Sequence, residues 1–107
     1  MRGSYISVAA MVALPFVTGY GSAQEIGRPD RGLALAQRLC SQCHAVRKEQ
    51  RQSSNENAPR FQAIASVPGM TSIALSAALN TSHRTMPNII LEADEQADVI
   101  AYILSLK

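Results

Sequence analysis

The sequence has little of what a large core or a membrane span requires. It contains no tryptophan, and only 5% of its 107 residues are aromatic. It has no apolar run of the roughly 18–20 residues that a membrane-spanning helix needs. Charged residues make up 17% of the chain, which is too few for a coiled coil or a strongly charged disordered protein. The net charge of +2 is too small to predict nucleic acid binding by itself. What remains is one small globular domain.

The first 23 residues have the pattern of a secretory signal peptide. Arg2 precedes an apolar stretch over residues 6–17, and small and turn-forming residues follow as far as Ala23. A positive start, an apolar region of about 7–15 residues and a small-x-small end are typical of such signals. We therefore expect cleavage after Ala23, export to the periplasm, and a folded domain over residues 24–107. An uncleaved anchor is the alternative, and the short apolar stretch argues against it.

Hydrophobic periodicity in the mature chain predicts an all-α fold with no strand. Asp30 is expected to cap the first helix, whereas Glu92 is an imperfect cap for the last. A polar loop over residues 47–60 separates the first helix from the others. The predicted helices cover residues 31–43, 60–65, 71–79 and 93–106.

The core of the mature chain is thin. Phe61 and Tyr102 are its only residues of the Phe, Tyr and Trp class. Domains near this size often need a disulfide, a metal or a cofactor to be stable. Each apolar candidate for a cofactor pocket serves equally well as an ordinary core residue. The candidates are Leu39, Val46, Phe61, Ile64, Leu75, Leu79, Ile89, Leu91, Val99 and Ile103.

The residues that point to chemistry are the pentad Cys40-Ser41-Gln42-Cys43-His44. Cys-x-x-Cys-His in an exported chain is the signal for covalent attachment of a c-type haem. The thiols of Cys40 and Cys43 are spaced to reach the two vinyl groups of one porphyrin. The imidazole of His44 then lies under the ring centre, where it can bind the iron. We therefore predict one covalently attached haem c.

Three other interpretations of the pentad fit less well. A thioredoxin-like redox motif requires a βαβ context, which the helical pattern does not offer. A structural zinc site needs four ligands, and only His83 remains to complete one. A plain disulfide between Cys40 and Cys43 is strained at this spacing and leaves His44 without a role.

Met86 is predicted to be the second axial ligand of the iron. It lies in a polar loop between two helices and is followed by Pro87, which restricts the backbone and helps to hold a loop ligand in place. Met70 and His83 are the other candidates for this ligand. Met70 follows a Pro-Gly turn and enters a helix, and His83 would give ligation by two histidines. A buried, gap-filling role is the alternative for Met86 itself.

The mature chain as a whole resembles a small class I cytochrome c. Besides the pentad, the matching features are Gly32 eight residues before Cys40, Asn57-Ala58-Pro59, Met86-Pro87 and the closing run over residues 98–103. The resemblance implies a cytochrome c fold, in which three to five helices surround one covalently bound haem. It also implies that the carbonyl of Pro59 accepts a hydrogen bond from His44, which would fix the tautomer of the imidazole and raise its basicity.

In that family the first and last helices cross at a contact of small residues with an aromatic one. Here the contact would join Gly32 and Ala36 to Tyr102. The position of Ala36 is often aromatic in the family, so we expect a looser crossing. Arg60 and Arg84 are candidates for contacts with the haem propionates.

Two axial ligands from the protein leave no position on the iron for a substrate, which favours electron transfer over catalysis. The resemblance therefore implies a monomeric periplasmic electron carrier and not an enzyme. Its redox partners would be a dehydrogenase or bc-type donor and an oxidase-type acceptor, with no nucleic acid partner. Two alternatives stay open. One is a haem subunit permanently docked to a periplasmic dehydrogenase, and the other is a ligand-binding haem sensor, if Met86 is not a stable ligand.

Overall fold

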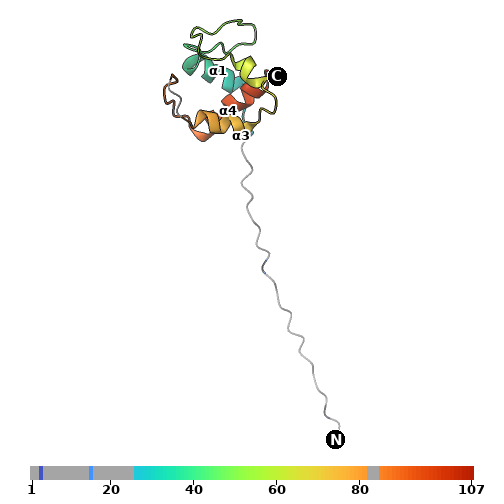
Figure 1. The fold of residues 1–107 in the computed structure, drawn as a ribbon. Coiled ribbons are helices and arrows are strands. Elements are labelled where there is room, and N and C mark those ends of the chain that lie inside the picture. The colour runs from blue at the N-terminus through green and yellow to red at the C-terminus, as the bar shows by residue number, and fades with distance from the viewer. Residues whose placement is uncertain (1–2, 4–14, 16–25, 82–84) are drawn as a thin grey trace.

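The computed structural model describes residues 3, 15, 26–81 and 85–107. Within these residues the chain forms four α-helices and no β-strand, so the all-α prediction is confirmed (Figure 1). Apart from residues 3 and 15, the predicted signal peptide lies outside the described residues. No helix in the described ranges is long and apolar enough to span a membrane. The helices are α1 (Pro29–Leu39), α2 (Phe61–Ala65), α3 (Ser72–Leu79) and α4 (Ala93–Leu104).

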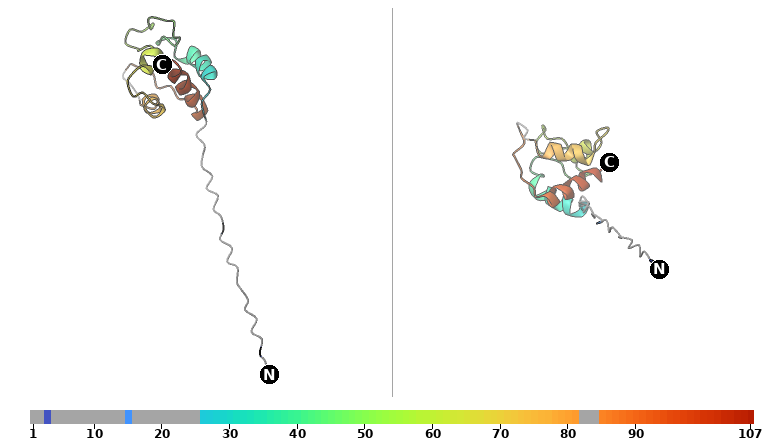
Figure 2. Two further views of the ribbon diagram at one scale, coloured as in Figure 1. Left: turned by 90° about the vertical axis from the view of Figure 1, so that its right-hand side faces the viewer. Right: turned by 90° about the horizontal axis from the view of Figure 1, so that it is seen from below.

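Helix α4 lies at the centre of the fold, between α1 and α3 (Figure 2). Its buried side chains contribute much of the core, because apolar residues recur along one face of the helix. Val99 and Ile103 are 1% and 3% exposed, and both also face the cavity described below. The predicted contact between the first and last helices is confirmed, since α1 packs directly on α4.

Gly32 lies where α1 crosses α4. A side chain at this position would overlap the carbonyl of Asp98 and would bring its Cβ to 2.8 Å from the Cβ of Tyr102. Ala36, one turn further along α1, is completely buried. The crossing is therefore close and not loose, because two small residues let the helix backbones approach each other.

The start and the end of α1 differ from the sequence prediction. The helix begins at Pro29, whose fixed φ suits the first turn. Asp30 consequently lies inside that turn and is not the cap. Its carboxylate still interacts favourably with the positive end of the helix dipole there. The helix ends at Leu39 and not at residue 43, because the chain turns at Cys40 into the pentad.

The other helix ends are also corrected by one or two residues. Helix α3 begins at Ser72, and the hydroxyl of Thr71 caps it by accepting from the backbone N–H of Ala74 at 3.2 Å. Glu92 is a better cap for α4 than expected. It forms a capping box with Glu95, in which the backbone N–H of Glu92 donates to the Glu95 carboxylate at 3.0 Å. Helix α2 begins at residue 61 and α4 ends at residue 104.

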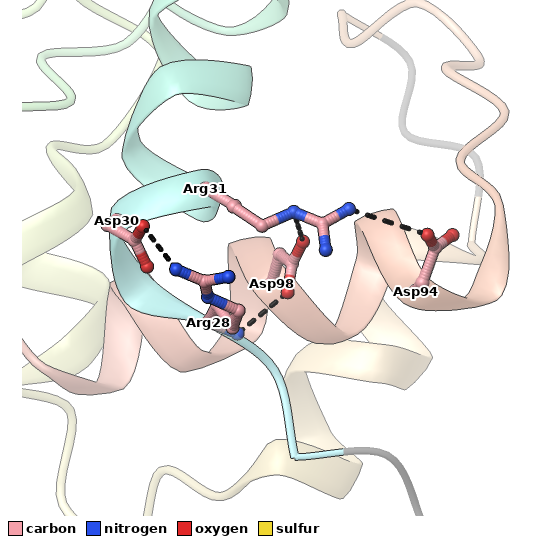
Figure 3. A network of polar contacts seen from close by, with 5 residues as sticks. All are labelled: Arg28, Asp30, Arg31, Asp94 and Asp98. Atoms are coloured by element: carbon pink, nitrogen blue, oxygen red, sulfur yellow. Dashed lines mark hydrogen bonds and ion pairs between the residues drawn. The ribbon is translucent and has the colours of Figure 1, made fainter.

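A polar network ties the start of α1 to α4 (Figure 3). The buried carboxylate of Asp98 accepts from the backbone N–H of Arg28 at 2.7 Å and pairs with Nε of Arg31 at 3.1 Å. Arg31 also lies 3.7 Å from Asp94, and Arg28 pairs with Asp30 at 3.0 Å. Asp98 therefore fixes the entry of the chain onto the surface of α4.

Asp98→Ala is expected to destabilise the folded protein more than Asp94→Ala. The side chain of Asp98 is 8% exposed and satisfies a backbone donor, so its loss costs about 1–3 kcal/mol. The side chain of Asp94 is 48% exposed, and such a surface pair contributes about 0–1 kcal/mol. Urea unfolding of the two haem-loaded variants measures the difference. Equal losses would show that the network contributes only as a surface ion pair.

Candidate functional site

One largely apolar cavity of about 240 Å3 lies between the helices. Its walls come from all of the described helices, from the pentad, and from the two connecting segments around residues 55–59 and 85–91. All of the predicted pocket residues line it except Val46, which is buried in the core nearby. Leu35 and Ala78 also line the cavity and were not among the predicted residues.

The pentad forms a tight turn directly after α1. The backbone N–H groups of Cys43 and His44 donate to the carbonyl of Cys40 at 3.2 and 2.9 Å. This turn brings both thiols and the imidazole to the cavity wall. Both cysteines are half-buried free thiols, so no disulfide joins them. Burial raises the pKa of the Cys40 thiol above its ordinary value, which keeps the sulfur neutral against the apolar wall.

The imidazole of His44 has one nitrogen engaged and one available. Its Nδ1 lies 2.6 Å from the carbonyl oxygen of Pro59, the residue named by the resemblance. A carbonyl can only accept a hydrogen bond, so Nδ1 must carry the proton. In this tautomer the lone pair lies on Nε2, and that lone pair is what a metal ligand requires.

The backbone on both sides of His44 is held by the polar loop. The carbonyl of Cys43 accepts from the N–H of Asn55 at 3.1 Å, and the N–H of Ala45 donates to the hydroxyl of Ser53 at 3.0 Å. The carbonyl of Ala45 accepts from the N–H of Phe61 at 3.0 Å. The loop, which lacks any hydrophobic period, therefore acts as a frame for the histidine.

Met86 is half-buried and lines the same cavity as the pentad. The structure thus brings its thioether together with the two thiols and the imidazole, although the sequence places it far from them. Met70 packs against the hydrophobic core and does not line the cavity. His83 and Arg84 lie outside the described residues. Arg60 donates to the carbonyl of Gln50 at 3.3 Å and is not part of the cavity wall.

Several polar side chains at the cavity escaped the sequence prediction. Two of them belong to motifs that the sequence shows, Asn57 to the Asn-Ala-Pro match and Gln42 to the pentad. The other two, Asn55 and Asn88, lie in segments without periodicity, where the sequence does not indicate which way a side chain points. The hydroxyl residues Thr81 and Thr85 precede Met86 in the sequence, as candidates to orient it, and both line the cavity on either side of the undescribed residues 82–84. Within the described ranges, no three His, Cys, Asp or Glu side chains gather as a metal-binding group.

The donor set at this cavity fits a haem. Two thiols match the two vinyl groups, an imidazole nitrogen and a thioether match the two axial positions of the iron, and apolar walls match the macrocycle. A helical domain with a Cys-x-x-Cys-His turn at such a cavity defines the class of c-type haem proteins.

The chain belongs to the cytochrome c family. The family model "Cytochrome c" matches residues 29–107, which is most of the chain and includes all four helices. Membership implies covalently bound haem c, haem-based electron transfer and redox partners. Members of the family are typically electron carriers and not enzymes. Neither the comparison with curated proteins nor the comparison with solved structures found a match.

Proposed function

We propose that this protein is a monohaem cytochrome that carries single electrons between redox proteins in the periplasm. In this proposal Cys40 and Cys43 hold the haem through thioether bonds, and His44 and Met86 are the axial ligands of the iron. The observation that supports it is the convergence of these four side chains on one apolar cavity. The bound haem would supply a one-electron iron couple.

The residues around the cavity have distinct parts in this function. The carbonyl of Pro59 accepts a hydrogen bond from the Nδ1–H of His44 and so raises the basicity of the imidazole. The thioether of Met86 favours ferrous iron and raises the reduction potential. The apolar walls exclude water and disfavour the extra positive charge of the ferric form. The reduction potential is thus set by opposing contributions. The more basic imidazole of His44 lowers it, whereas the thioether of Met86 and the apolar walls raise it.

The carrier is distinguished from a ligand-binding sensor by whether the iron has an open position. Wild-type protein is expected to titrate as a single one-electron couple and to bind no carbon monoxide at neutral pH, because both axial positions are filled. A redox titration followed by carbon monoxide addition to the reduced protein makes the measurement. Uptake of carbon monoxide by the wild type would favour the sensor.

The partners are proposed to be redox proteins, with a dehydrogenase or bc-type donor and an oxidase-type acceptor. Arg47, Lys48 and Arg51 are exposed on the loop that follows the pentad, which supports an acidic partner surface. The interfaces of redox proteins are typically small and transient, and electron exchange with such a partner is expected to slow as the salt concentration rises.

A haem subunit docked to a periplasmic dehydrogenase is the alternative. It would copurify with that enzyme at a fixed ratio, whereas a carrier would not.

The signal-like pattern of residues 1–23 supports the periplasmic location and a mature chain that begins at residue 24. N-terminal sequencing or the intact mass of the exported protein tests the cleavage. A mass that retains these residues would favour the anchored alternative.

A further inference from the structure

Tyr102 of α4 reaches from the helix crossing to the backbone beside His44. Its side chain is buried, and its hydroxyl donates to the carbonyl of Val46 at 2.5 Å. Val46 follows His44 by two residues. This bond therefore ties the backbone just after His44, which we call the proximal segment, to α4. Tyr102 is itself fixed, because its Cβ lies against Gly32 where α1 crosses α4.

Phe61 makes a second connection between Tyr102 and His44. The ring of Phe61 lies 6.5 Å from the ring of Tyr102, with an angle of 52° between the planes. Its ring centroid also lies 5.4 Å from that of the His44 imidazole, at 53°. These tilted contacts are in the range of favourable aromatic pairs. Phe61 is also 4% exposed and bonded through its backbone to Ala45, so it has little freedom to move.

We propose that Tyr102 is a positioning residue for His44, acting through Val46 and Phe61. The proposal rests on the proposed function of His44 as an axial ligand. The hydroxyl fixes the backbone after the histidine, and the ring supports the phenyl group that packs against the imidazole. Together they hold Nδ1 at hydrogen-bonding distance from the Pro59 carbonyl. The orientation of α4 thereby sets the basicity of the proximal ligand.

The potential of the iron should respond to this contact in a defined direction. When the imidazole is held against Pro59, it is a stronger electron donor and stabilises ferric iron. If the segment relaxes, the bond between Nδ1 and the carbonyl weakens and the imidazole donates less. Ferric iron is then less stabilised, so the reduction potential rises.

Tyr102→Phe tests the proposal on the haem-loaded protein, because it removes the hydroxyl and keeps the ring. Ser105→Ala is the matched control. The hydroxyl of Ser105 also donates to a backbone carbonyl at 2.5 Å, but its acceptor is Tyr102 of α4 and not a residue after His44. We expect Tyr102→Phe to raise the reduction potential and to speed hydrogen exchange of the His44 Nδ1 proton severalfold in NMR spectra of the reduced protein. The control should change neither.

A second variant keeps the test decisive if Tyr102→Phe does not fold. Phe61→Leu preserves an apolar side chain, removes the ring contact with His44, and should shift the potential and the exchange rate in the same directions. If the variants lose stability while both readouts stay at their wild-type values, Tyr102 is only structural and the inference is overturned. The spectrum of the wild-type protein is recorded before any variant is made. If it shows no histidine ligation, the proposed function and the inference are overturned together.

Discussion

Replacing both Cys40 and Cys43 with serine is expected to abolish covalent haem attachment. Each thiol would add its S–H across one vinyl group, so that a C–S and a C–H bond form while the S–H bond and one π bond are lost. This addition needs no oxidant or reductant. Serine has nearly the same size but lacks the soft sulfur nucleophile, and both thiols stand free at the cavity wall. Intact mass spectrometry of the exported protein would show the mass of the polypeptide alone.

Ser41→Ala is the control for the cysteine variant. Ser41 lies inside the pentad, and its hydroxyl donates to the carbonyl of Gln37 at 2.5 Å on the side of α1. Its removal perturbs the same turn without removing a thiol, so the haem mass should be retained. If the double serine variant still carries the haem mass after extraction with acidified organic solvent, attachment does not occur through these cysteines.

Met86→Ala is expected to lower the reduction potential and open the iron to external ligands. Loss of the thioether removes the ligand that favours ferrous iron. A fall on the order of 100 mV is expected, within the span of about 0.8 V over which axial ligands set haem potentials. The variant should also bind carbon monoxide at neutral pH. Potentiometric titration and optical detection of the carbon monoxide complex measure the two effects.

Met70→Ala provides the comparison for Met86→Ala. Met70 is the other methionine of residues 24–107 and packs against the core outside the cavity. Its truncation should cost stability, because apolar contacts are lost, but should leave the potential and the axial ligation unchanged. If Met70→Ala and not Met86→Ala opened the iron, the assignment of the ligand would be wrong.

Local spacing was enough to predict the elements and most of the cavity wall. Val99 and Ile103 recur with helical period on α4, and both line the cavity. The ends of α1 were less predictable, since Pro29 and Asp30 are both good residues for a first turn and only the structure shows which begins the helix. Its end depends on the pentad turn, which is held by bonds to the carbonyl of Cys40.

Contacts between distant segments account for what the sequence did not predict. The pentad is a local motif, so its spacing alone indicates attachment chemistry. The hydroxyl of Tyr102 bonds to Val46, which lies in another segment and has no pattern that marks its carbonyl as an acceptor. The closeness of the helix crossing likewise follows from where Asp98 lies opposite Gly32. Periodicity tells which side of a helix is buried, and it does not tell what that side meets.

The optical spectrum of the oxidised and reduced wild-type protein tests the central claim most directly. The full chain, including residues 1–23, would be produced in a host that has a haem-maturation system. The account predicts a covalently bound haem and, in the oxidised form, the weak band near the infrared edge that marks methionine bound to iron. Absence of covalent haem, under conditions in which a control cytochrome matures, would contradict the account. Covalent haem without that band would contradict ligation by Met86.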